Sequence, residues 1–271
     1  MIQNIASRLD LLYDRLNQRK YVHPDPLEFL YFYNDIRDRE IVGLVSSSLA
    51  YGRVAQILKS VSAILKKMGP EPSVFLKESN YETLKATFEG FVHRFATGDK
   101  MAAFLTGVKA VVEHFGSLEQ CFTAGLVKNE KTVFPALDFF AGKIRQYCPA
   151  CPGHLVPVPG STSACKRLNL YFRWMVRCDA VDPGGWDIFR VPKLIVPLDI
   201  HMHRICLQLG FTRRKTADMK TAMEITRSFV DISSHDPVKY DFVLTRIGIR
   251  DDLDPGIFYS STSNIENAKP K

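Results

Sequence analysis

Apolar residues recur along most of this chain every three or four positions, which is the spacing of one face of an α-helix. Leu9, Leu12 and Leu16 form the first such stripe, and Phe242 and Leu244 belong to the last. Runs that alternate apolar and polar residues, as strands do, are scarce. The pattern therefore predicts an all-α fold.

Proline, glycine and short polar residues mark where these helices should begin and end. A helical region over 38–68 should break near Tyr51 and Gly52, and Asp236 with Pro237 should open the last helix. The other main helices that the pattern predicts cover residues 5–19, 101–115, 118–126, 133–147, 165–177, 199–209 and 217–230. We expect one helical domain over 1–250 and a flexible polar tail over 251–271.

The predicted helix over 165–177 carries two stripes of different character. At about 100° per residue, Leu168, Phe172 and Met175 lie on one side, whereas Lys166 and Arg173 lie on the other. The sequence therefore predicts a core face and a cationic face, with Lys166 in the first turn of the cationic one.

The segment before this helix is rich in turn residues. It contains Pro157, Pro159 and Gly160, followed by hydroxyl residues at 161–163. Such a turn leaves backbone amides accessible at a helix N-terminus, where an anion such as a DNA phosphate can bind. Gly160, Ser161 and Ser163 are then candidate phosphate contacts. The alternative is a proline-rich turn with Ser163 near the N-cap and no ligand.

A second helix begins after Pro197, with Asp199 as its N-cap and Gly210 as its stop. His201 and Arg204 share its polar face. Asp199 is either a cap and nothing more or a functional carboxylate. A capping carboxylate accepts backbone N–H bonds, which favour its charged form, so Asp199 should be anionic near neutral pH.

A lysine and a fixed carboxylate suit one particular chemistry. A lysine amine can attack an electrophilic carbon and form a Schiff base. Cleaving a nucleoside from its sugar needs such a nucleophile, and a carboxylate to stabilise positive charge on the sugar ring. Lys166 and Asp199 supply both groups if they meet across one cleft.

These residues also carry a family resemblance. The run 166–170, Lys-Arg-Leu-Asn-Leu, and the run 197–202, Pro-Leu-Asp-Ile-His-Met, resemble the helix-hairpin-helix DNA glycosylases. Asp199 follows Lys166 by 33 residues, a separation similar to that of archaeal 8-oxoguanine DNA glycosylases. The stretch 163–177, with 236–242 later, also resembles a bacterial family that is known only as a domain of unknown function.

The glycosylase resemblance implies a fold and an activity. The fold would have two helical lobes with a cleft between them, and the hairpin and catalytic helices would span about 155–210. Lys166 would be the nucleophile and Asp199 the catalytic carboxylate. His201 would contact a backbone phosphate, and Arg204 and Arg173 are further candidates for DNA contacts. The activity would be that of a DNA N-glycosylase and AP lyase in base excision repair, acting on an oxidised purine such as 8-oxoguanine, with no metal or organic cofactor.

Other segments acquire expected roles from the same resemblance. Residues 46–53 resemble a loop that lies against DNA, where Tyr51 would stack and Arg53 would hold a phosphate or the estranged base. The alternative is a simple helix break with a hydrogen-bonded tyrosine. Phe242 and Thr245 would border the base pocket. Trp186 is either a stacking platform for the base or a plug in the core.

Two features depart from the glycosylase pattern. The Leu-Pro-Gly-x-Gly hairpin appears here without its second glycine, and no four-cysteine cluster follows the second helix. A different cysteine group consists of Cys148, Cys151, His154 and Cys165. These residues allow three interpretations, which are a zinc site, a redox pair and unligated thiols.

The charge balance favours an acidic partner. The 36 Lys and Arg residues exceed the 29 Asp and Glu residues and give a net charge of +7, which suits nucleic acid. No apolar run reaches the about 18 residues of a membrane span. We therefore expect a cytoplasmic, nucleoid-associated monomer that binds double-stranded DNA with a damaged base or abasic site. The competing hypotheses are a non-catalytic DNA-binding protein with the same fold and a zinc-stabilised interaction protein.

Overall fold

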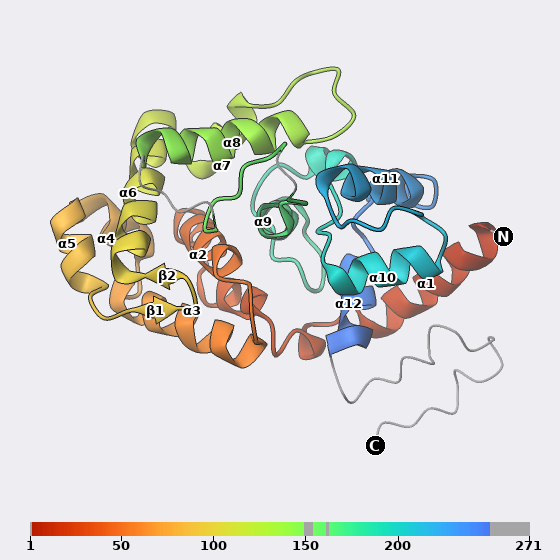
Figure 1. Ribbon diagram of the computed structural model, residues 1–271, viewed down its shortest axis with the longest axis horizontal. Helices are drawn as coiled ribbons and strands as arrows, with labels where there is room; N and C mark the ends of the chain where they lie inside the picture. The colour runs from red at the N-terminus through yellow and green to blue at the C-terminus, as the bar shows by residue number, and fades with distance from the viewer. Residues whose placement is uncertain (1, 149–153, 161–162, 250–271) are drawn as a thin grey trace.

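The computed structural model describes residues 2–148, 154–160 and 163–249, and these are mostly helical (Figure 1). The α-helices are α1 (Ile2–Leu16), α2 (Ile36–Ser48), α3 (Val54–Met68), α4 (Pro72–Glu78), α5 (Tyr81–Thr87), α6 (Gly98–Phe115), α7 (Leu118–Ala124), α8 (Phe134–Tyr147), α9 (Lys166–Val176), α10 (Ile200–Gln208), α11 (Met219–Val230) and α12 (Asp241–Ile249). The 3-10 helices are η1 (Arg19–Tyr21), η2 (Pro26–Phe32) and η3 (Ile188–Lys193). The strands β1 (Val92–His93) and β2 (Ala96–Thr97) form an antiparallel hairpin. The prediction of an all-α fold is confirmed.

Side-chain caps fix where several helices begin. The carboxylates of Asp35, Asp199 and Asp218 accept backbone N–H bonds at the starts of α2, α10 and α11. Such caps satisfy amides that have no partner inside the helix. The expected break near Tyr51 is also present, because α2 ends at Ser48 and α3 begins at Val54.

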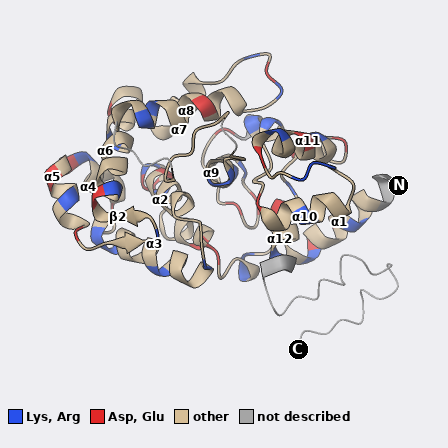
Figure 2. Ribbon diagram, in the orientation of Figure 1, with Lys and Arg blue, Asp and Glu red and all other residues tan. Residues whose placement is uncertain are grey.

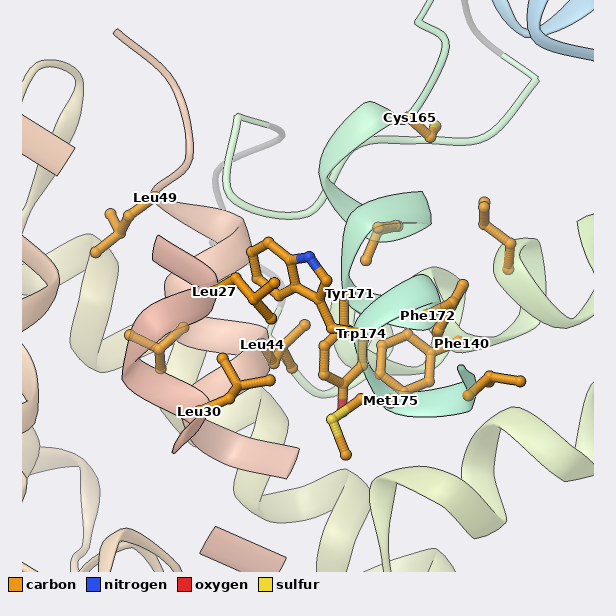
Figure 3. Packing of buried hydrophobic residues seen from close by; sticks show 14 of the residues in the cluster. Leu27, Leu30, Leu44, Leu49, Phe140, Cys165, Tyr171, Phe172, Trp174 and Met175 are labelled. Atoms are coloured by element: carbon orange, nitrogen blue, oxygen red, sulfur yellow. The ribbon is translucent and has the colours of Figure 1, made fainter. Parts of the chain in front are cut away.

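Helix α9 lies at the centre of the molecule, between two groups of helices (Figure 1). Helices α2 to α8 lie on one side of it, and α1 and α10 to α12 lie on the other. Figure 3 shows Tyr171, Phe172 and Trp174 of α9 among leucines of η2 and α2. Because α9 is packed from several directions, most of its side chains are buried.

This central position changes the interpretation of the cationic face of α9. Arg173 is buried, and its guanidinium pairs with the carboxylates of Asp182 and Asp241. Arg177 is buried in the same way and pairs with Asp182 and Asp236. The face therefore meets acidic side chains inside the protein, and only its first turn reaches solvent, through Lys166.

Two local predictions differ from the structure. The last helix begins at Asp241 and not at Asp236, whose carboxylate instead accepts the Val238 N–H and pairs with Arg177 in a turn. The β1–β2 hairpin was not expected, because two-residue strands leave no alternating pattern to detect.

Charge and hydropathy add two observations at the level of the whole fold. Lys and Arg are interspersed with Asp and Glu along helices of both groups (Figure 2). Among the described helices, none combines the length and the apolar character needed to cross a bilayer.

Candidate active site

A pocket of about 500 Å³ opens where the two groups of helices meet beside α9. Its lining comes from separate parts of the chain, within 24–26, 50–57, 166–174, 197–201 and 241–246. A pocket of this volume is in the usual range for a small-molecule or nucleotide site. Lys166 and Asp199 both line it.

Lys166 is the first residue of α9, at the mouth of the pocket. Its side chain is 35% exposed, and its Nζ lies 2.9 Å from Asp199 Oδ2. The preceding residue, Cys165, has a φ of 49° and is buried. This left-handed turn at the start of α9 directs the chain into the helix with Lys166 at the pocket edge.

Asp199 uses its two oxygens for different partners. Oδ1 accepts the backbone N–H of Met202 at 2.8 Å and caps α10, while Oδ2 pairs with Lys166. Burial alone would raise the pKa of Asp199, but the charge of Lys166 and the Met202 N–H outweigh it and hold the pKa below its ordinary value. The carboxylate is therefore an anion in direct contact with the lysine on the pocket lining.

The floor of the pocket is a buried ionic cluster. Asp241, at the start of α12, is paired with Arg173 through Oδ2, whereas its buried Oδ1 has no hydrogen-bond partner among the described residues. Burial raises the pKa of Asp241 to about 6; the charge of Arg173 opposes the shift and that of Asp199 adds to it. The pocket thus contains two carboxyl groups whose pKa values are shifted in opposite directions.

The walls beside this floor are largely apolar. Leu170, Trp174 and Phe242 line them, and the guanidinium carbons of Arg173 and Arg246 lie 5.9 Å and 5.0 Å from the centre of the Phe242 ring. The Thr245 hydroxyl donates to the carbonyls of Asp241 and Phe242. Phe242 and Thr245 therefore both line this pocket, and their contact with an extruded base stays a prediction.

Two expected contacts lie elsewhere. Trp186 is buried in the core, where its Nε1 donates to Glu40 Oε1 at 2.9 Å and its ring packs against Phe122 and Tyr171. It is the core plug and not a platform in the pocket. Arg173 is likewise wrong as a phosphate contact, because both sides of its guanidinium face buried carboxylates.

The other residues expected to contact DNA lie in the pocket lining or outside it. His201 lines the pocket, and Arg204 is exposed on α10 outside the lining. Arg53 is exposed at the start of α3. Tyr51 lines the pocket too, but its hydroxyl donates to the His93 carbonyl at 3.2 Å and its ring stacks edge-on against His93. Tyr51 is therefore held by the protein, so it would need to move before it could stack on a base.

The turn before α9 is only partly described. Gly160 is exposed, with a φ of 81°. The Ser163 hydroxyl accepts the backbone N–H of Cys165 at 3.1 Å, so this amide already has a partner. Ser161 lies outside the described residues.

The cysteine group does not form a metal site in the part of the chain that can be described. Cys148 and Cys165 are buried, and the described residues contain no cluster of three or more metal-ligating side chains. Cys151 lies outside the described residues. Burial raises the pKa of the Cys165 thiol to about 11, which favours an uncharged, unreactive thiol beside Lys166.

Sequence reasoning missed two lining residues that come from opposite ends of the chain. Arg246 of α12 pairs with Asp25 at 2.6 Å, and its guanidinium also donates to the Val22 carbonyl. Neither residue lies in a recognisable motif. The sequence shows only an acidic residue at 25 and a basic residue at 246, which does not indicate that the two are paired. The pair joins the first and last parts of the pocket wall.

One comparison with known proteins gives a match. A family model described as a protein of unknown function (DUF2400) matches residues 25–250. No curated protein and no solved structure matches the chain.

Proposed function

Given that the chain belongs to the DUF2400 family, whose description names no function, we propose from its pocket that it is a DNA glycosylase with AP lyase activity. The observation that carries the proposal is the pair formed by Lys166 Nζ and Asp199 Oδ2, 2.9 Å apart at the mouth of a pocket of about 500 Å³. An amine and an ionised carboxylate in one nucleotide-sized pocket are the two groups that this chemistry needs.

The reaction begins with transfer of a proton from Lys166 to Asp199. The neutral Nζ attacks C1′ of an extruded nucleotide, the N-glycosidic bond breaks, and the base leaves with the bonding electrons. The base takes up the proton that Asp199 received, so Asp199 is again a carboxylate. The carboxylate of Asp199 stabilises the positive charge that develops on the sugar. The C1′–O4′ bond then opens, O4′ takes up a proton that Nζ releases, and an iminium remains between Nζ and C1′.

The lyase step follows from this Schiff base. Removal of a proton from C2′ expels the 3′-phosphate, so the C3′–O bond breaks and the strand is cut. The iminium is the electron sink for that elimination. Hydrolysis then releases the amine of Lys166.

The remaining lining fits an extruded base. Leu170, Trp174 and Phe242 offer an apolar wall to such a base. The two groups of helices on either side of α9 would be the two lobes of a glycosylase, with the DNA across the opening between them. The separation of Lys166 and Asp199 along the chain favours an oxidised purine such as 8-oxoguanine as the substrate.

Borohydride trapping tests the proposal directly, because reduction of the Schiff base joins the protein covalently to DNA. The wild-type protein should be trapped on duplexes that contain 8-oxoguanine or an abasic site, and Lys166→Gln should not. Lys239→Gln is the matched control: Lys239 is also ion-paired, with Asp10 at 2.6 Å, and its side chain is 29% exposed, but it lies outside the pocket lining.

Three outcomes decide between the hypotheses. Trapping that is lost in Lys166→Gln and retained in Lys239→Gln supports the proposal. Equal trapping by Lys166→Gln shows that another amine is the nucleophile. A wild-type protein that binds these duplexes but is not trapped, abasic sites included, is a DNA-binding protein and not a lyase.

A further inference from the structure

The β1–β2 hairpin presents an exposed aromatic residue close to the pocket. Val92 pairs with Thr97 and His93 with Ala96, so Arg94 and Phe95 form the tip. Phe95 is 62% exposed. Arg94 has a φ of 53°, which is uncommon for a residue other than glycine. Residues in such a conformation are often found at functional sites.

The base of the hairpin is firmly held by its surroundings. The buried His93 ring makes hydrogen bonds to the Ser60 hydroxyl of α3 at 2.9 Å and to the Tyr51 carbonyl at 3.1 Å. Lys100 donates to the Phe95 carbonyl at 2.8 Å. An exposed ring on an anchored backbone loses little conformational freedom when it binds a ligand.

The hairpin reaches the pocket through Arg94. Gly52 lines the pocket, and a Cβ built on it would lie 3.0 Å from Cδ and 3.2 Å from Nη1 of Arg94. The arginine side chain therefore crosses directly over Gly52. The Arg94 guanidinium carbon also lies 5.5 Å from the centre of the Phe95 ring, so charge and aromatic surface are adjacent at the rim.

The field on this side of the hairpin is positive. Among the ion pairs of the described residues, none involves Arg94, Lys100 or Arg167, although Arg167 donates to the Ser48 carbonyl at 2.7 Å. The buried Nε2 of His154, whose ring lies 6.2 Å from that of Phe95, has no hydrogen-bond partner in the part of the chain that the structure describes. Burial lowers the pKa of His154, and the charges of Lys100 and Arg167 lower it further.

The opposite face of the hairpin has the other sign. Val92 and Thr97 border a depression whose lining has an excess of acidic residues, Glu82, Glu89 and Asp99 against Lys85. A polyanion is therefore repelled from that face and attracted to the Arg94 side.

We propose that the hairpin tip binds the DNA strand opposite the extruded nucleotide, with the partner base stacked on Phe95 and a phosphate against Arg94. The proposal rests on the proposed function, because an unpaired base is exposed only when its partner has left the helix. A flat aromatic ring beside unpaired cations matches the two parts of a nucleotide, its base and its phosphate. The hairpin would hold the opposite strand while α9 and α10 act on the extruded sugar.

A fluorescent base tests this contact without any chemistry. The probe is a duplex with 2-aminopurine opposite a tetrahydrofuran abasic analogue, which cannot form a Schiff base. Binding of the wild-type protein should quench the 2-aminopurine. Phe95→Ala should abolish the quenching and weaken binding by about five-fold to a hundred-fold, the usual range for one base–aromatic stack.

Val92→Ala is the matched control, because Val92 is equally exposed, at 62%, on the same hairpin but on its acidic side. It should bind and quench as the wild type does. Arg94→Asn keeps a residue that tolerates positive φ and should weaken binding while the quenching on Phe95 remains. Quenching that survives in Phe95→Ala, that is absent in the wild type, or that is lost equally in Val92→Ala overturns the proposal.

The outcome is independent of the trapping experiment. Quenching by Phe95 with no borohydride adduct would leave the hairpin contact standing and refute the lyase. An adduct that depends on Lys166, with no quenching by Phe95, would support the lyase and refute the hairpin contact.

Discussion

Asp199 combines a structural and a chemical role in one side chain, and its two oxygens allow them to be separated. Asparagine caps a helix about as well as aspartate, so Asp199→Asn should keep the Met202 N–H satisfied while it removes the charge beside Lys166. We expect the rate of borohydride trapping to fall by about a hundred-fold or more, which is typical for loss of one electrostatic group. The melting temperature should change little.

The companion variant Asp199→Ala removes both roles. It should lose the trapping activity and also about 1 kcal/mol of stability from the missing cap. If Asp199→Asn is trapped as fast as the wild type, the carboxylate is a cap and nothing more.

Asp241 should make the protein less stable as the pH rises toward neutral. Its pKa is raised from 3.8 to about 6, so the folded state binds a proton more tightly than the unfolded state. Between these two values the folded protein holds the proton that the unfolded chain releases, and stability falls with rising pH. The full effect of this shift is about 3 kcal/mol.

The comparison that isolates this effect uses Asp241→Asn, which cannot titrate and leaves Arg173 paired with Asp182. The free energy of unfolding, measured with urea between pH 4 and pH 7, should fall in the wild type relative to the variant. A difference that stays constant over this range would mean that Asp241 is ionised throughout.

At the scale of helices, two glycines that look alike in the sequence have opposite expected effects. A Cβ at Gly107 of α6 would lie 2.7 Å from the Ile144 carbonyl oxygen and 2.8 Å from Cys148 Cβ, whereas one at Gly142 of α8 meets nothing within 4 Å. Gly107→Ala should force α6 and α8 apart at a cost of about 1–3 kcal/mol. Gly142→Ala should stabilise the protein by up to about 1 kcal/mol, because alanine favours the helix.

Urea denaturation of both variants checks this pair. Equal effects would show that helix propensity and not close packing controls these positions. The free energy of unfolding is the suitable measure, because neither residue touches the pocket.

The elements that the sequence predicted well are those defined by local signals. The cap of α10 at Asp199 and the end of α6 before Gly116 depend on residues within one helical turn, so they can be read from the chain itself. The roles of Arg173 and Asp236 depend on partners up to 68 residues away, so local pattern misassigned both. The hairpin was missed because its strands have two residues each, which is too short for an alternating apolar and polar pattern.

At the scale of the whole molecule, the pocket is assembled from distant parts of the chain. The resemblance to glycosylases brought Lys166 and Asp199 together from 33 residues apart, and the structure places them in contact. Nothing comparable indicated the pairing of Asp25 with Arg246, or of Asp10 with Lys239, which tie the start of the chain to its end. Such contacts follow from the packing of the first part of the chain against the segment that includes α12, and not from any motif.

The charge distribution leads to a prediction about DNA binding as a whole. Each phosphate that a protein neutralises adds about 0.9 to the slope of log K against log salt concentration. Because acidic and basic residues are interspersed over the molecule (Figure 2), the net charge of +7 does not say how many cations face one duplex. Exposed cations beside the pocket, such as Arg53 between the lining residues Gly52 and Val54, should account for the slope.

Fluorescence anisotropy with an abasic-analogue duplex, titrated over a range of salt concentrations, measures that slope. Arg53→Ala should lower its magnitude by about one phosphate contact and weaken binding at every salt concentration. Lys85→Ala is the control, because Lys85 is exposed on α5 in the depression that Glu82 and Glu89 also line. If removal of Lys85 lowers the slope as much as removal of Arg53, the duplex does not lie across the pocket. Lys166 would then be too far from the phosphate backbone to reach C1′, and the glycosylase proposal would lose its geometry.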